Sequence, residues 1–128
     1  MNAAAEGTVY PDASFLVDPR RVAAFREVFG QSQGVPPTFV TAAEFVVFPQ
    51  VIGDPHLGLD FTRVVHGSQD YAHERPLHEG ETLTVRARID SIRTKGANGF
   101  LTIAMELFDA EGALVCTARS QMIERGPA

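Results

Sequence analysis

The sequence predicts an α+β fold in which an antiparallel sheet wraps around one buried helix. An apolar stretch at residues 37–48 has hydrophobic side chains in nearly every direction around a helix axis, which is typical of a helix buried on all sides. From about residue 61 onward, apolar and polar residues alternate with a period of two, as in strands with one buried face. Helices followed by a run of long strands indicate an α+β arrangement.

The first elements are a short strand at 14–17 and an amphipathic helix. Asp18 suits the N-cap of this helix, Pro19 its first turn, and Gly30 the position after its end. The apolar residues spaced along one face are Val22, Phe25, Val28 and Phe29. We therefore expect this face to pack against the rest of the protein.

The apolar stretch that begins at Pro37 is predicted to be the buried helix, closed by Pro49. Its β-branched residues make a strand the competing interpretation, because periodicity does not separate the two in so short a run. Loops are expected on either side, over residues 31–36 and 49–60, where proline and glycine recur.

The second half of the chain is predicted to be a set of antiparallel strands. One strand buries alternate residues from 83 to 89, and after a hairpin at 93–99 another buries alternate residues from 101 to 107. A turn at 109–112 leads into the last strand. A sheet that wraps one apolar helix in this order is the hot-dog arrangement.

Length and composition predict one domain over residues 12–128, preceded by a flexible tail at 1–11. The net charge of −5 and the scattered basic residues argue against a nucleic-acid surface. The single cysteine, Cys116, excludes an internal disulfide and a metal site built on cysteines. With no secretory leader and no stretch as long as a membrane span, we expect a soluble cytoplasmic protein.

The stretch V-V-H-G-S-Q-D-Y-A-H-E-R-P-L-H-E-G-E, residues 64–81, holds three of the four histidines. In a strand, His66, Ser68 and Asp70 would share one face, and Gln69, Tyr71 and His73 the other. No Ser-His-Asp relay or metal site can then form within the strand, so a polar edge or interface strand is the first interpretation. His66 remains a candidate, since Gly67 beside it lets backbone approach a ligand.

The remaining polar candidates are expected to be structural. His56, in G-D-P-H-L-G, is interpreted as part of a turn built on Asp54, Pro55 and glycine. Neither a phosphate-binding glycine loop nor a dinucleotide motif is present. We therefore expect no cofactor and no metal.

Three stretches together resemble the MaoC-like hot-dog dehydratases: V-P-P-T-F at 35–39, the stretch at 64–81, and D-A-E-G-A-L-V-C-T-A-R-S-Q-M-I-E-R at 109–125. The likeness is greatest to the N-terminal half of the fungal-synthase type and to the A subunit of the mycobacterial (3R)-hydroxyacyl-carrier-protein dehydratase. It implies a place in fatty acid metabolism, where this family adds or removes water across the 2,3-bond of an acyl thioester.

The sequence departs from the family at the catalytic loop. Active members carry G-D-x-N-P-[LIV]-H between the first helix and the buried helix, and here residues 24–39 contain no Asp and no His. Because G-D-P-H at 53–56 lies after the buried helix, the resemblance gives Asp54 and His56 no catalytic role. Pro36 and Pro37 have no N–H, so a backbone donor to the thioester oxygen would come from Thr38 or Phe39.

The first functional hypothesis is thus a non-catalytic subunit, or half-site, that binds acyl-CoA or acyl carrier protein. It would form a homodimer, or a heterodimer with a catalytic MaoC-like subunit. The acyl site is expected near the start of the buried helix, formed by Thr38, Phe39, His66, Gly67 and Gln69.

Two alternatives remain open. The chain could itself be a hydratase or a hot-dog thioesterase, with His66 as the base and Asp54 or His56 reaching in from the loop. Or it could be an interaction module without an acyl ligand, in which side chains such as Phe45 and Phe48 fill the pocket.

Overall fold

The computed structural model describes residues 1–31 and 33–127. Ser32, in the loop expected after the first helix, and Ala128, at the end of the expected domain, lie outside the described residues. The helical elements are η1 (Ala3–Ala5), α1 (Pro19–Phe29), η2 (Pro37–Val40), α2 (Thr41–Glu44), α3 (Phe48–Ile52) and η3 (Phe61–Arg63). The strands are β1 (Ala13–Leu16), β2 (Val64–His73), β3 (Thr82–Lys95), β4 (Asn98–Phe108) and β5 (Leu114–Glu124).

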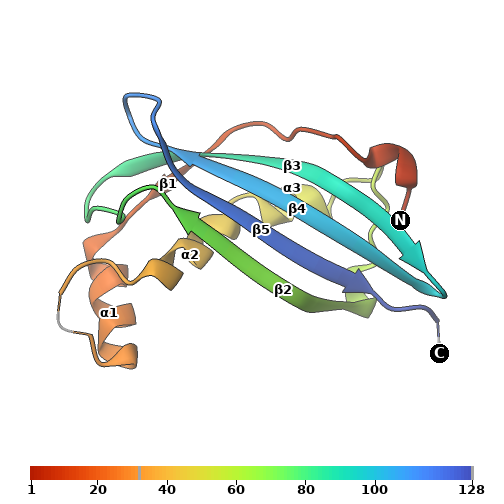
Figure 1. Cartoon of the computed structure of the whole chain (residues 1–128), viewed down its shortest axis with the longest axis horizontal. Helices are drawn as coiled ribbons and strands as arrows, with labels where there is room; N and C mark the ends of the chain where they lie inside the picture. Colours follow the sequence, from red (N-terminus) through yellow and green to blue (C-terminus); the bar gives the residue numbers. More distant parts are fainter. Residues whose placement is uncertain (32, 128) are drawn as a thin grey trace.

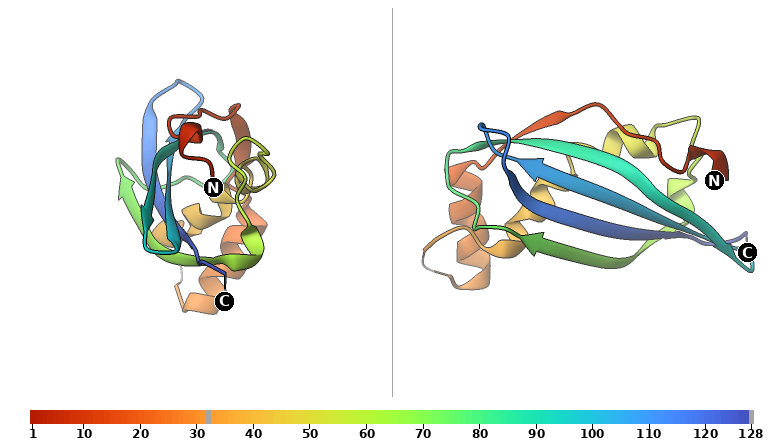
Figure 2. Two further views of the ribbon diagram at one scale, coloured as in Figure 1. Left: turned by 90° about the vertical axis from the view of Figure 1, so that its right-hand side faces the viewer. Right: turned by 45° about the horizontal axis from the view of Figure 1, so that its top comes forward.

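The five strands form one antiparallel sheet in the order β1-β3-β4-β5-β2. The helices α2 and α3 run along one face of this sheet (Figure 1), and the end-on view shows the sheet curving around them (Figure 2, left). The predicted sheet around a central helix is present. β2 and β1 are the two edge strands, and β2 pairs with β5 on one side only.

The inner face of the sheet forms the core. The alternating rows predicted on β3 and β4 are confirmed, since Leu83, Val85, Ala87, Ile89, Leu101, Ile103, Met105 and Leu107 are all at most 1% exposed. β3 and β4 extend further than predicted, so that the hairpin turn shrinks to Gly96 and Ala97. Gly96 has φ 62°, a left-handed conformation that favours glycine in such a tight turn.

The central helix is interrupted, which differs from the continuous helix predicted for residues 37–48. A turn at 45–47 separates α2 from α3, and the helical path continues past Pro49 to Ile52. Pro49 has no N–H for the carbonyl of Phe45, and its ring would clash with that carbonyl in a regular helix. The break turns Phe45 outward, where its side chain is 63% exposed, so the helix is not buried on all sides as predicted.

Helix α1 begins and ends as predicted. The Asp18 side chain accepts a hydrogen bond from the Arg20 N–H, and Gly30 takes the left-handed conformation after the last turn. Its apolar face is buried only in part: Val22 is inaccessible, whereas Val28 and Phe29 are 79% and 61% exposed. The apolar face of α1 is therefore longer than the part of it that packs against the core.

The first eleven residues, predicted to be a flexible tail, make backbone hydrogen bonds to the sheet. Backbone hydrogen bonds join Gly7 and Thr8 to Ile89, and Tyr10 to Ala87, along the outer edge of β3. Figure 1 shows this segment beside β3 from the N-terminus to β1. Backbone pairing of this kind leaves no trace in a sequence of small and polar residues, because it depends little on side chains.

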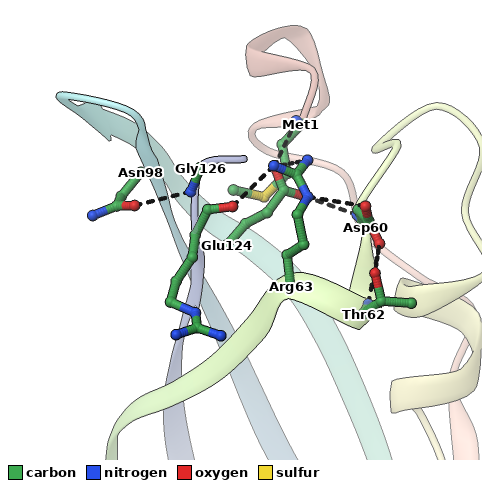
Figure 3. A network of polar contacts seen from close by, with 8 residues as sticks. Met1, Asp60, Thr62, Arg63, Asn98, Glu124 and Gly126 are labelled. Carbon is green, nitrogen blue, oxygen red and sulfur yellow. Dashed lines mark hydrogen bonds and ion pairs between the residues drawn. The ribbon is translucent and has the colours of Figure 1, made fainter. Parts of the chain in front are cut away.

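A polar network holds the chain in place at the start of β2 (Figure 3). Glu124 on β5 is 8% exposed, and its Oε2 accepts a hydrogen bond of 2.8 Å from the Asp60 N–H. Arg63 extends between them, with Nε 2.9 Å from Asp60 Oδ2 and Nη2 3.8 Å from Glu124 Oε1. The Met1 amino nitrogen lies 3.4 Å from Glu124 Oε1. These contacts position the start of β2, which carries His66.

Candidate functional site

A cavity of about 430 Å³ lies between the central helix and the strands β2 and β5. Its apolar lining residues are Phe45, Phe48, Pro49, Ile52, Phe61, Val64 and Met122, and its polar lining residues are Thr41, Glu44 and His66. The break in the helix places Phe45 and Phe48 edge to face, with ring centroids 5.8 Å apart, in its wall. An apolar cavity with a few convergent polar groups is the usual form of a small-molecule site.

Glu44 is the buried polar group of this cavity. It sits on α2 with only 1% of its surface exposed, and its Oε1 accepts a hydrogen bond of 2.8 Å from the Tyr71 hydroxyl. That hydroxyl also contacts Thr41 Oγ1. Burial raises the pKa of Glu44, and the Tyr71 hydrogen bond and the charge of His66 oppose the rise only in part. Burial also raises the pKa of Tyr71, and Glu44 as acceptor adds to that rise, so the phenol stays a donor.

His66 reaches the cavity because β2 contains a bulge. The pairing of β2 with β5 runs His66 with Met122 and then Ser68 with Gln121, so Gly67 is the extra residue. The bulge reverses the alternation, and His66 shares the inner face with Gln69, Tyr71 and His73. The prediction that His66 lies with Ser68 and Asp70 is therefore wrong. Its Nε2 lies 3.1 Å from Ser120 Oγ on β5, which holds the ring in place.

Asp54 and His56 are not among the residues that line the cavity. Asp54 Oδ2 accepts a hydrogen bond of 2.8 Å from the Tyr10 hydroxyl, and its Oδ1 accepts one from the His56 N–H. The Tyr10 hydrogen bond lowers the pKa of Asp54, while burial and the same hydrogen bond raise the pKa of Tyr10. The loop thus ties the N-terminal segment to the fold, and nothing in its geometry pairs either residue with His66.

The two residues expected at the start of the helix are also absent from the cavity lining. Phe39 is 2% exposed and packs on Phe15 and Phe25, and its N–H donates to the Pro36 carbonyl at 2.9 Å. Thr38 is exposed. The structure therefore brings neither residue to this cavity.

Gly67 and Gln69 have structural contacts on β2. A Cβ atom on Gly67 would lie 3.0 Å from Ile123 Cδ1, so the bulge packs closely on β5. Gln69 Nε2 donates to the Arg119 carbonyl at 3.1 Å, while its Oε1 is buried without a hydrogen-bond partner among the described residues. Of the five predicted substrate-binding residues, only His66 lines the cavity.

Sequence reasoning overlooked Glu44, Thr41 and Tyr71. One signal was available for Glu44, because it is the only charged residue between positions 28 and 53 and lies in the middle of the apolar helix. A carboxyl at such a position is rarely buried without a specific partner. The partner, Tyr71, comes from a strand 27 residues away, and no local pattern indicates this pairing.

Two further features of the described residues concern metal binding and membrane insertion. Within residues 1–31 and 33–127, no three His, Cys, Asp or Glu side chains converge as metal ligands. The described part of the chain also has no helix with the length and apolarity needed to cross a membrane.

A family model and a curated relative match most of this sequence. The sequence model of the FAS1-like, dehydratase domain region matches residues 13–118. A UPF0336 protein of Saccharopolyspora erythraea is 42% identical over 93 residues, which is 73% of this chain and 60% of that relative. The chain thus spans less than two thirds of the length of such relatives.

Solved structures show the same fold. The HadBC (3R)-hydroxyacyl-ACP dehydratase complex of Mycobacterium tuberculosis superimposes with a TM-score of 0.77 at 19% identity, over 93% of this chain and 96% of that chain. A MaoC-like dehydratase from Phytophthora capsici gives 0.77 at 20% identity, over 98% of this chain and 50% of that chain. The predicted α+β hot-dog fold is confirmed.

Proposed function

The chain belongs to the family of the FAS1-like dehydratase domain region, and from that premise we propose that it binds an acyl thioester in the cavity beside the central helix. In this proposal the chain is the non-catalytic half of a (3R)-hydroxyacyl dehydratase or enoyl hydratase, and it takes acyl-CoA or acyl carrier protein. The observation that carries the proposal is the open apolar cavity between the central helix and β2.

The cavity suits an acyl chain in size and lining. Its volume of about 430 Å³ lies within the range of roughly 300–1,000 Å³ that is usual for ligand sites. Phe45 and Phe48 stand in its wall and leave the space between the helix and the sheet open. This arrangement favours a bound ligand over a plain interaction module, for which we expected these rings to fill the pocket.

The loop before the central helix supports a non-catalytic role. Residues 30–36 contain no Asp and no His, the two residue types that the resemblance implies for the family's water-activating pair. The free edge of β2, next to exposed apolar side chains such as Val65 (41%), Phe45 (63%) and Phe61 (53%), supports pairing with a second hot-dog unit. The partner would be a second copy of this chain or a catalytic MaoC-like subunit.

A second candidate function is enoyl-thioester hydration by the chain itself. The observation that favours it is the presence of both Glu44 and His66 in the wall of one cavity. One group could take a proton from water as its oxygen bonds to C3 of the substrate, while the other gives a proton to C2. In this mechanism Glu44 acts together with His66, a role that the sequence had suggested for Asp54 or His56.

Hydration of crotonyl-CoA and of a longer enoyl-CoA by the purified protein separates the two candidates. The proposed non-catalytic role predicts no turnover by the protein alone and turnover after a catalytic subunit is added. Turnover that disappears in Glu44→Gln and in His66→Ala, and persists in the distant variant Glu106→Gln, would overturn the non-catalytic role in favour of the second candidate.

A further inference from the structure

Among residues 1–31 and 33–127, the basic residues without an ion pair lie at two places on the surface. Arg20 and Arg21 lie at the start of α1, and Arg93, Lys95 and Arg125 lie at one end of the sheet; all are exposed. The basic residues that do form ion pairs are Arg26, Arg63, Arg75, Arg86, Arg88 and Arg119. The group on the sheet makes a locally positive surface on a protein whose net charge is −5.

The three basic residues of the sheet come together because β5 ends beside the hairpin that joins β3 to β4 (Figure 1). Asn98 Oδ1, on the hairpin, accepts a hydrogen bond of 3.0 Å from the Gly126 N–H, which holds Arg125 next to it. Arg93 and Lys95 are two positions apart on β3 and therefore point to the same face. Arg93, Lys95 and Arg125 thus form a basic patch.

An apolar row crosses the sheet beside this basic patch. On β4, Phe100 pairs with Arg93 on one side and with Ile123 of β5 on the other, and Ile123 pairs in turn with Val65 of β2. The row is on the outer face, because the next residue of β4, Leu101, is buried in the core. Phe100 and Ile123 are half-buried and Val65 is exposed. Four strands span about 14 Å, enough for one helix to lie across them.

This arrangement suits an acidic helix better than a single phosphate group. Arg93 and Arg125 are two strands apart, roughly 10 Å between their backbones, so the charges surround the apolar row and do not converge on one point. A helix laid on this face would place an apolar side chain over Phe100 and Ile123, and its carboxylates would meet the basic side chains at the rim.

An anionic membrane is the other surface that attracts basic residues. Clusters that bind anionic lipids typically hold about 4–8 Lys or Arg residues, more than this basic patch has, and the net charge of −5 is repelled by a negative surface. A partner helix would contact the basic patch alone, and a Debye length of about 8 Å at physiological salt weakens repulsion from the rest of the chain. The charges therefore favour a protein partner.

The apolar row ends at the strand that forms one wall of the cavity. Its last residue, Val65, lies between Val64 and His66, which line the cavity from the other face of β2. We propose that the basic patch docks an acidic helix of a carrier protein, which presents its acyl thioester to the cavity from this end of the sheet. This inference rests on the proposed binding of acyl thioesters and assigns the outer face as the docking surface for the protein that carries them.

The test compares the binding of an octanoyl acyl carrier protein and of octanoyl-CoA by the full chain at low ionic strength. Arg93→Glu/Lys95→Glu reverses two charges of the basic patch. Arg20→Glu/Arg21→Glu reverses two exposed charges on α1 and gives the same net charge, so it is the matched control. We expect the first variant to bind the octanoyl carrier protein at least about tenfold more weakly than the wild-type protein does, and the control to bind it like the wild-type protein. Both variants should keep the wild-type affinity for octanoyl-CoA.

A third variant keeps the test decisive if the substitutions on β3 prevent folding. Arg125→Glu lies on the other side of the basic patch, beyond the end of β5, and should also weaken the carrier protein without weakening octanoyl-CoA. An equal loss of carrier binding in both double variants would show that net charge alone acts, and would overturn the inference. Unchanged carrier binding in the patch variants would overturn it as well, and so would a loss limited to octanoyl-CoA, which would assign the basic patch to the phosphates of CoA.

The unloaded carrier protein separates this inference from the function on which it depends. It has no acyl chain for the cavity, so its binding measures docking alone, and the patch variants should weaken that binding too. If it docks through the basic patch while octanoyl-CoA does not bind, the proposed acyl site fails and the docking surface stands. If octanoyl-CoA binds and neither form of the carrier protein does, the docking inference is overturned and acyl-thioester binding stands.

Discussion

The carboxyl of Glu44 is the least expected group at the scale of single residues. It lies in an apolar helix, its only protein donor among the described residues is the Tyr71 hydroxyl, and burial raises its pKa. Buried carboxyls with raised pKa values occur most often at functional sites, although structural contacts can also produce them. Here the position in the wall of an open cavity supports a functional role.

Replacement of Glu44 by glutamine should change how stability depends on pH. Folding raises the pKa of Glu44 above its ordinary value of 4.5, so the folded protein holds this proton more tightly than the unfolded chain. The resulting stabilisation is complete below pH 4.5 and is lost as the pH rises through the raised folded pKa. The glutamine side chain cannot ionise, so the stability of the variant relative to the wild-type protein should increase as the pH rises.

Urea denaturation of both proteins at about pH 4, 6 and 8 measures this difference. The same substitution at Glu106, on the outer face of the sheet, is the matched control. A constant difference between Glu44→Gln and wild type at all three pH values would mean that the Glu44 carboxyl is not sheltered from water as the structure indicates.

At the scale of secondary structure, the features that depend only on neighbouring residues were predicted correctly from the sequence. The caps of α1 at Asp18 and Gly30 and the buried rows of β3 and β4 follow from residue types and spacing, and all are present. The break in the central helix also had a local cause in Pro49, but the prediction ended the helix there, although a proline can open a new helical turn.

The bulge at Gly67 could not be predicted by assigning successive residues to alternate faces of the strand, because that assignment assumes that no residue is inserted. A glycine inside a strand often marks a bulge, and this was the available signal. Its consequence is large, since the bulge decides whether His66 points into the cavity or away from it.

Deletion of Gly67 should therefore remove His66 from the cavity. Without the extra residue, the segment that includes Val64 and His66 would shift by one position and exchange its faces. We expect a loss of about 1–3 kcal/mol in the free energy of unfolding and at least about tenfold weaker acyl-CoA binding. Gly67→Ala, which keeps the residue count, should retain most of the binding. Full binding by the deletion variant would show that the bulge does not position the site.

At the scale of the whole molecule, the site is assembled from segments that lie far apart in the sequence. Its wall combines the central helix, η3, the start of β2 and the end of β5. The network around Glu124 joins the end of β5 to Asp60 and Arg63, which precede β2, and to the N-terminal Met1. Sequence patterns report the period of each element, and they do not specify which elements meet, so Glu44 and Tyr71 could not be paired in advance.

The free edge of β2 leads to a prediction about assembly. Val65→Lys places a charge on the exposed edge strand, a change that natural proteins use to prevent sheets from joining. If the protein pairs through β2, light scattering should show a two-chain particle for the wild-type protein and mostly single chains for the variant. Val28→Lys, at an exposed position on α1, should leave the assembly unchanged. A wild-type protein that is monomeric both alone and with a catalytic subunit would contradict the proposed pairing.

The most direct measurement is a calorimetric titration of the purified protein with an acyl-CoA, repeated on Ile52→Trp and Val28→Trp. Ile52 lines the cavity, and the larger ring should fill much of its volume, whereas Val28 lies on the exposed surface of α1. We predict saturable binding by the wild-type protein and by Val28→Trp, and binding at least about tenfold weaker by a folded Ile52→Trp. Equal affinity in all three proteins, or no binding by any of them, would contradict the assignment of the cavity as the acyl-thioester site.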